Sequence, residues 1–195
     1  SLLGPGGSVA GATINSETLW SAFWCTPTFE RSPDAEQRKA RVHERFCAWA
    51  GPTASLIAAT PTDVIAEVGI WDRDPSPAWC LGRTALIGDA AHPMTPYLGQ
   101  GANSAMVDAF VLAHYLGRET PAAAFTAYEA RRKPATDKNV LTARRVCDFS
   151  TSESAWKRFA MVSMMRLAPP TWTLRSMLRA DRSNDVSDLL AQAKA

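Results

Sequence analysis

The sequence GRTALIGDAAHPMTPYLGQGANSAMVDAFVLAHYL, residues 82–116, decides how this chain is expected to fold. It begins with a short apolar run, Thr84–Ile87, which predicts a buried strand that ends at Gly88 and Asp89. An irregular loop with prolines follows, and Gly101–Leu116 then has the pattern of an apolar-faced helix. A strand, a polar turn and a helix opened by glycines together predict a ligand site of the α/β type.

The start of this predicted helix is suited to an anion. Gly99 and Gly101 would let a ligand approach the backbone closely. The first turn of a helix presents N–H groups without intrahelical acceptors and a partial positive charge. Asp89 could accept hydrogen bonds from ligand hydroxyls such as those of a ribose or ribitol, and a turn residue or helix cap is the alternative interpretation.

Composition excludes some classes of function. The 195 residues are 46% hydrophobic and carry a formal net charge of +2, which allows a sizeable core and gives no electrostatic preference for nucleic acid or membranes. No run approaches the roughly 18 apolar residues of a membrane span. Four widely spaced cysteines and only three histidines predict reduced thiols, a cytoplasmic protein and no metal site.

The N-terminal region predicts a β-hairpin. Leu2–Gly11 nearly matches the dinucleotide fingerprint G-x-G-x-x-G, but the sixth position is Val9, and a strand-like sequence follows. Val9–Ile14 and Leu19–Cys25 are expected to be paired strands joined by a turn of three or four residues. Both faces of the second strand carry apolar or aromatic groups, so we expect both faces to be covered. Core packing is one interpretation, and the alternative is that one face lines an apolar substrate cavity.

A helix and a third strand should complete this region. Ser32 is the expected N-cap of a helix whose buried stripe would be Val42, Phe46 and Trp49. Asp63–Trp71 alternates in part and predicts the strand. The order favours an antiparallel sheet with a helix against it.

Helices are predicted for the rest of the chain. Pro121 begins one with an exposed end at Arg131–Lys133, and Pro134 either kinks it or begins the next. Another amphipathic helix spans Trp156–Leu167, and the tail after Arg179 should be a weak or frayed helix. The expected inner face of the first is Ala124, Phe125 and Tyr128, and methionines of the second, as core filler or a contact surface, are Met161, Met164 and Met165.

Residues 82–116 closely resemble the second FAD-binding motif of the class A flavoprotein aromatic-ring monooxygenases, relatives of para-hydroxybenzoate hydroxylase and salicylate hydroxylase. The shared pattern is G-R-x-x-L-x-G-D-A-A-H-x-x-x-P-x-x-G-Q-G-x-N-x-x-x-x-D-A. The resemblance implies that Asp89 binds the ribityl chain of FAD, that Gly99–Asn103 lie beside the pyrimidine end of the flavin, and that His92 is structural. It implies a cofactor site formed by Gly88, Asp89, Pro96, Gly99, Gln100, Gly101, Ala102 and Asn103.

The resemblance also implies an activity. It predicts a monooxygenase that uses FAD and NAD(P)H and hydroxylates or epoxidises an aromatic or apolar small molecule through a flavin hydroperoxide. Its catalytic acid–base residues are not identified by the motif. The alternative is a non-catalytic remnant or split-protein module that binds a partner chain.

Two further motifs of that family are missing. The family begins with a strand and G-x-G-x-x-G, and has a middle motif with an Asp-Gly pair, which occurs nowhere in this chain. We therefore expect the C-terminal half of a family member, inactive alone, whose partner is the N-terminal half or a complementary chain.

The predicted fold class is α/β, or more closely an α+β fragment. It would comprise the end of an antiparallel substrate-domain sheet, the last strand and helix of a Rossmann-like FAD domain, and C-terminal helices. The corresponding predicted regions are 1–78 as a partial substrate-binding sheet domain, 79–117 as an FAD-binding strand–loop–helix, and 118–195 as a helical region.

Overall fold

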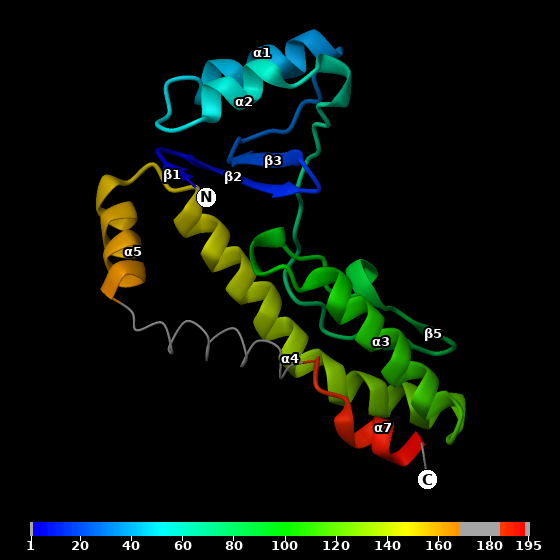
Figure 1. Cartoon of the computed structure of the whole chain (residues 1–195). Helices are drawn as coiled ribbons and strands as arrows, with labels where there is room; N and C mark the ends of the chain where they lie inside the picture. Colours follow the sequence, from blue (N-terminus) through cyan, green and yellow to red (C-terminus); the bar gives the residue numbers. More distant parts are fainter. Residues whose placement is uncertain (1, 168–183, 194–195) are drawn as a thin grey trace. The chain divides into compact units, whose positions relative to one another are not determined.

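The structure, a computed structural model, describes residues 2–167 and 184–193, shown in Figure 1. The chain divides into two compact units, which are described separately. The part of the chain that is described is a mixture of helices and small sheets. None of its helices is long and apolar enough to cross a membrane.

The first unit, Ser1–Ile70 with Asp148–Ser163, is built on a three-stranded antiparallel sheet. The strands β1 (Leu2–Gly4), β2 (Gly7–Ile14) and β3 (Glu17–Trp24) follow one another in the sheet in the order of the sequence. The glycine-rich start of the chain therefore forms a strand and a tight turn, the alternative that the sequence favoured over a nucleotide-binding loop.

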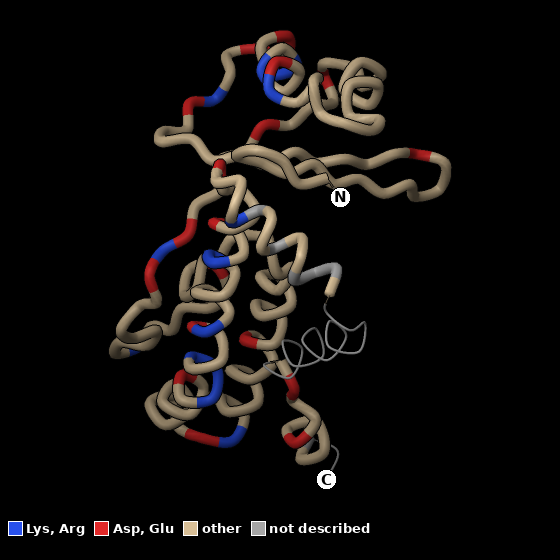
Figure 2. The backbone as a smooth tube through the Cα atoms, turned by 90° about the vertical axis from the view of Figure 1, so that its left-hand side faces the viewer, with Lys and Arg blue, Asp and Glu red and all other residues tan. Residues whose placement is uncertain are grey.

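The predicted hairpin is confirmed, but its turn is shorter than expected. Ile14 pairs directly with Glu17, so that only Asn15 and Ser16 form the turn. Both have positive φ, 48° and 69°, as two-residue turns that match the twist of paired strands require. Figure 2 shows that the hairpin is almost free of charge, with Glu17 near its tip.

Among the described residues, one face of strand β3 packs on the core and the other, on which Phe23 is half-buried, is covered only in part. Trp20, Ala22 and Trp24 pack against the core of this unit. Leu19, on the opposite face, is 69% exposed, and Ile14 on β2 is exposed as well. The expectation that both faces are covered is therefore wrong at these positions, because aromatic and apolar residues on a strand do not by themselves supply a covering element.

Two helices, α1 (Ala35–Phe46) and α2 (Thr53–Ala59), contribute the rest of this core. The N-cap of α1 is Asp34, whose Oδ1 accepts from the N–H of Gln37 at 2.8 Å. Ser32 was the expected cap, but it lies two residues before the observed one, and its N–H donates to Oε2 of Glu67. The buried residues are Val9, Val42, Phe46 and Ile57, with Trp20, Ala22, Trp24 and Trp49 packed against them.

The third strand expected at Asp63–Trp71 does not form. A short 3₁₀ helix, η1 (Thr62–Val64), is followed by irregular chain, in which Val68 is 71% exposed. A strand needs a neighbour for its backbone N–H and C=O groups, and the sheet β1–β2–β3 does not extend to this segment. The alternating sequence favours a strand, but no strand among the described residues pairs with it.

Helix α5 (Ala155–Leu167) forms where it was predicted. Its aromatic residues Trp156 and Phe159 are exposed, and their rings stack on one another with 5.9 Å between the centroids. The side chains of Met161, Met164 and Met165 lie outside the described residues, as does the tail between 168 and 183.

The second unit, Trp71–Cys147 with Met164–Ala195, is mainly helical. In Figure 1 its helices α3 (Gly101–Leu116), α4 (Pro121–Ser150) and α7 (Ser187–Ala193) lie side by side, while residues 148–150 of α4 group with the first unit. Helix α3 has the bounds that the sequence predicted.

Helix α4 is continuous through Pro134 and does not end or restart there. Its buried residues recur every three or four positions, as a helix packed along one face requires. The core of the unit comprises Trp79, Ala91, Val111, Tyr128 and Leu189.

The predicted buried strand Thr84–Ile87 is largely absent. Strand β5 (Thr84–Ala85) is only two residues long and pairs antiparallel with β4 (Cys80–Leu81), across a turn at Gly82 with φ 57°. Ile87 is exposed. A buried strand needs neighbours on both sides, and the described residues supply a single one.

Candidate functional site

The proposed flavin-binding residues lie in one continuous turn–loop–helix of the second unit. Asp89 is in the 3₁₀ turn η2 (Gly88–Ala90), and its side chain is exposed. Pro96 begins a second turn, η3 (Pro96–Leu98), which Gly99 ends with φ 62°. Helix α3 starts two residues later. The turns therefore place Asp89 and the helix start on one segment of about a dozen residues.

Gly88 holds the first turn close to α3. Its φ is 55°, and a Cβ atom at this position would lie 3.0 Å from the Cβ of Ala105. Its N–H donates to Oδ2 of Asp108 at 3.1 Å. Only glycine combines this backbone conformation with so close a helix.

Asp108 is the centre of a buried polar network. Its side chain has no exposed surface, and its Oδ2 also accepts from Nε2 of His92 at 2.5 Å. Its Oδ1 accepts from Nε of Arg132 at 2.8 Å. A carboxylate can only accept, so His92 carries its proton on Nε2. Asp108 thus binds the amide of the turn, the side chain of the motif histidine and a guanidinium from α4.

The hydrogen bonds decide the charge of this carboxyl. Burial by itself would raise the pKa of Asp108, because it disfavours the charged form. The hydrogen bonds from His92, Arg132 and Gly88 stabilise the anion more strongly, and they hold the pKa of Asp108 below its ordinary value. The network thus contains a carboxylate paired with a guanidinium, both shielded from water.

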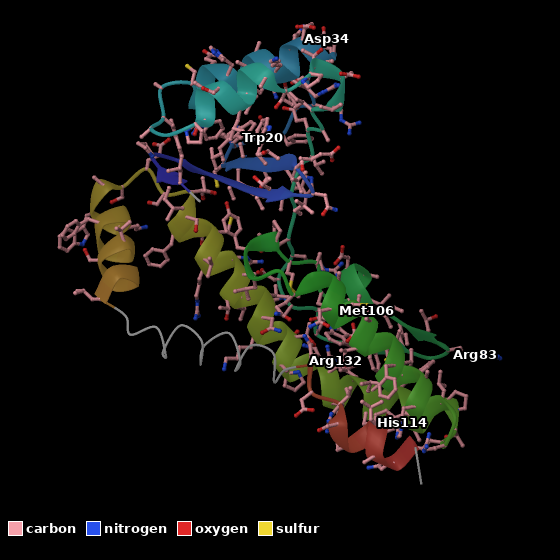
Figure 3. All side chains as sticks on the ribbon, viewed as in Figure 1. Trp20, Asp34, Arg83, Met106, His114 and Arg132 are labelled. Atoms are coloured by element: carbon pink, nitrogen blue, oxygen red, sulfur yellow. The ribbon has the colours of Figure 1, made fainter. Side chains whose placement is uncertain are left out.

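Arg132 connects this carboxylate to the C-terminal segment. Its Nη2 donates to Oδ1 of Asn184 at 2.9 Å. The Nδ2 of Asn184 in turn donates to Oε1 of Gln100 at 2.9 Å. Gln100 is the residue before α3, and its backbone oxygen accepts the first hydrogen bond of the helix, from the N–H of Ser104. Figure 3 places Arg132 on α4 where the segment before α7 meets it.

The remaining predicted residues form the first turn of α3. Gly101 and Asn103 are half-buried, Ala102 is exposed, and Nδ2 of Asn103 donates to Oε1 of Gln100 at 3.4 Å. A Cβ atom at Gly99 would meet no atom within 4 Å, so the backbone there is accessible to a ligand. These groups fit a planar molecule with acceptor atoms at one edge.

A second set of contacts fixes the turn η2 from outside. Nη2 of Arg73 donates to the backbone oxygen of Ala90 at 2.6 Å. The flanking residues Asp72 and Asp74 both pair with Arg144 of α4, each at 2.6 Å. The three residues 72–74 thus join the long helix to the turn that carries Asp89.

Three of these residues were missed in the sequence. Arg132 was expected at an exposed helix end, but it is 2% exposed. Its spacing gives the signal, because it lies four residues from both Tyr128 and Thr136, which are buried on the same face of α4. Nothing near Asn184 or Arg73 in the sequence marks them. His114, later on α3, is buried and its ring contacts Phe110 and Tyr115.

No metal centre is found within the described ranges, where no three His, Cys, Asp or Glu side chains come together. The chemistry of the site is that of hydrogen-bond donors and one exposed carboxylate. Donors and a carboxylate of this kind can hydrogen-bond the hydroxyl and carbonyl groups of an organic molecule.

Comparison with known proteins gives the class. A family described as the FAD binding domain matches residues 11–143, which is more than half of the chain. The chain therefore belongs to this FAD binding domain family, whose cofactor is FAD.

Several curated enzymes are similar to the chain. The aurachin C monooxygenase/isomerase of Stigmatella aurantiaca is 36% identical over 77% of this chain and 39% of its own length. A 3-amino-4-hydroxybenzoate 2-monooxygenase of Streptomyces platensis is 39% identical over 68% and 34%. The FAD-dependent urate hydroxylase of Klebsiella pneumoniae is 39% identical over 60% and 31%. The chain thus spans less than half the length of these relatives, all of which are named as enzymes.

Solved structures agree with the fold. Klebsiella pneumoniae HpxO complexed with FAD and uric acid superposes with a TM-score of 0.83 at 29% identity, over 93% of this chain and 47% of that one. A salicylate hydroxylase substrate complex gives a TM-score of 0.62 at 24% identity, which supports the fold alone. The mixed helices and small sheets match the fold of these hydroxylases.

Proposed function

We propose that this chain supplies the flavin-ring half of the FAD site of a monooxygenase that acts on an aromatic or similarly apolar small molecule. The carrying observation is the exposed Asp89 beside the first turn of α3, both held by the buried network around Asp108. The site has the donors that such a cofactor needs and a backbone open to it at Gly99.

Each part of the site has a separate role in this proposal. Asp89 accepts hydrogen bonds from the ribityl hydroxyls. Pro96 shapes the loop between Asp89 and the start of α3. The amides of Gly101–Asn103 face the pyrimidine edge of the ring, where a helix N-terminus stabilises negative charge by roughly 0.3–2 kcal/mol. When bound, FAD supplies the redox chemistry, and the residues of this chain bind, orient and shield it.

We also propose how this chain relates to a whole enzyme. The chain corresponds to the C-terminal half of a member related to para-hydroxybenzoate hydroxylase, with NAD(P)H as the reductant. The coverage of less than half of each relative supports this, as do the missing G-x-G-x-x-G and Asp-Gly motifs. We expect the adenine end of FAD to be bound by the N-terminal half.

Reconstitution tests the proposal. The 195-residue chain is mixed with the polypeptide that supplies the N-terminal half, and bound flavin absorbance and NAD(P)H oxidation are measured. We expect flavin to co-purify with the pair, and Asp89→Ala to weaken its affinity about tenfold by removal of charge-assisted hydrogen bonds. The matched control is Glu44→Ala, which removes another exposed acid, on α1 of the first unit. No flavin uptake by the unsubstituted pair would contradict the proposal.

A further inference from the structure

The start of α3 depends on a side chain from the other end of the chain. Gln100 has no hydrogen bond that caps the helix with its side chain. Its Oε1 instead accepts from Nδ2 of Asn184 at 2.9 Å, across 84 residues of sequence. Asn184 is therefore the residue that fixes the orientation of the Gln100 side chain from outside the motif.

Asn184 is itself fixed by three groups. Its Oδ1 accepts from Nη2 of Arg132 at 2.9 Å and lies 3.5 Å from the hydroxyl of Ser104. Arg132 is held by Asp108, which also binds the amide of Gly88. Asn184 is only 9% exposed, so water competes little for its amide. The Asn184 amide thus completes a polar path between Gly88 and Gln100, the two ends of the turn–loop segment.

We propose that Asn184 is a positioning residue of the cofactor site, which locks Gln100 and the first turn of α3 in the orientation that presents their amides. This inference rests on the proposed function for the identity of the ligand, FAD. The segment before α7, which no motif marks, then belongs to the cofactor site. Loss of its contact would loosen the amides of the first turn without removing any group that touches the ligand.

A matched pair of substitutions separates this role from simple docking of the C-terminal segment. Asn184→Leu removes the hydrogen bonds to Gln100, Arg132 and Ser104 and keeps a branched side chain with the same number of heavy atoms. Asp188→Ala removes the exposed ion pair with Arg131, 2.7 Å long, which ties the same segment to α4 but does not touch the network. Gln100→Met removes the acceptor of the hydrogen bond from Asn184, and it replaces Asn184→Leu in the test if that variant does not fold.

Amide hydrogen exchange of the 195-residue chain alone measures, without flavin, how firmly the first turn of α3 is held. The N–H of Ser104, the first to bond within α3, should exchange about 2- to 10-fold faster in Asn184→Leu and in Gln100→Met, as expected for the loss of one or two hydrogen bonds. The amide of Val111, in the middle of the same helix, should change less than twofold, and Asp188→Ala should leave Ser104 within twofold.

The outcomes are separable. Equal acceleration at Ser104 and Val111, or an unchanged Ser104 in both network variants, would overturn the inference. An equal effect of Asp188→Ala would also overturn it, because docking alone would then suffice. In the reconstituted pair, the two network variants should weaken FAD affinity several-fold. Absence of flavin uptake by the unsubstituted pair would instead count against the proposed function, whereas the exchange result is measured independently of it.

Discussion

The segment Gly88–Leu116 and the segment Asp63–Trp71 both have strong local patterns, yet only the first forms the structure that its pattern predicts. Gly88–Leu116 is held by a carboxylate, a guanidinium and an amide that lie within the second unit. Asp63–Trp71 has no paired strand, and Val68 within it is exposed. The second segment is contacted by Arg41 at Glu67 and by Arg38 at the backbone oxygen of Ile65, but it has no neighbouring strand among the described residues. Under the proposed function, the N-terminal half would supply that strand.

The difference shows which part of the site this chain can form alone. Buried polar groups are costly unless they are bonded, so the hydrogen bonds to Asp108 favour one arrangement of this segment. Exposed apolar groups at strand spacing have no such constraint until a neighbouring strand covers them. Substitutions in the two segments should therefore differ greatly in their effect on the free energy of unfolding.

The largest effect is expected at Asp108. Asp108→Asn removes the charge that compensates Arg132 and places an amide donor against N–H donors. We expect the free energy of unfolding to fall by about 3–5 kcal/mol, as for a broken buried ion pair. Urea denaturation followed by circular dichroism measures it.

The control for this variant is an exposed ion pair of the same unit, between Arg131 of α4 and Asp188 of α7. Asp188→Asn removes the partner of Arg131, in an ion pair that is exposed on both sides. Exposed pairs contribute at most about 1 kcal/mol, so the effect should be several times smaller. Similar losses for the two variants would show that the buried network is not what distinguishes this segment.

Acid should remove part of the Asp108 contribution. The pKa of Asp108 is lowered in the folded chain, from about 3.9 in an unfolded one, so its stabilisation is complete above that value. It is lost as the pH falls through the lower, folded pKa. We expect the difference in free energy of unfolding between the natural chain and Asp108→Asn to be constant from pH 7 to about 5 and to narrow below about 4. A difference that stays constant down to pH 3 would contradict the charge-based explanation.

Two glycines allow a smaller test within the loop. Gly88→Ala meets both a positive φ and the Cβ of Ala105 at 3.0 Å, and we expect a loss of about 2 kcal/mol. Gly99→Ala meets only the positive φ, with no atom within 4 Å, and about 1 kcal/mol should be lost. Thermal unfolding of both variants measures the difference. Equal losses would mean that the close approach to α3 contributes nothing.

Local pattern predicted much of this fold. The bounds of α3 followed from glycines at its start and apolar spacing along it, and the hairpin from two β-rich runs around Asn15. These features depend on residues close in sequence. The buried position of Arg132 could not be read from charge, since the same residue type is exposed at Arg131.

Long-range contacts could not be predicted. Asn184 lies 84 residues from Gln100, and an asparagine has no pattern that identifies its partner. The strand at Asp63–Trp71 failed for the opposite reason, because its pattern was present and its neighbour was not. Of the cofactor site, the turn–loop–helix was visible in the sequence, while the network that holds it depended on the folded chain.

The smallest effect is expected at Val68, and it tests the second half of the comparison. Val68→Thr should change the free energy of unfolding of this chain by less than about 0.5 kcal/mol, because the side chain is already exposed. In the reconstituted pair the same change should weaken association of the two halves, since Val68 would then be covered as part of a strand. Titration calorimetry of the two halves measures this, with Val64→Thr as a control, because Val64 is also exposed but lies in η1 rather than in the extended segment. Unchanged association in Val68→Thr, or an equal loss in the control, would show that this segment is not completed by the partner.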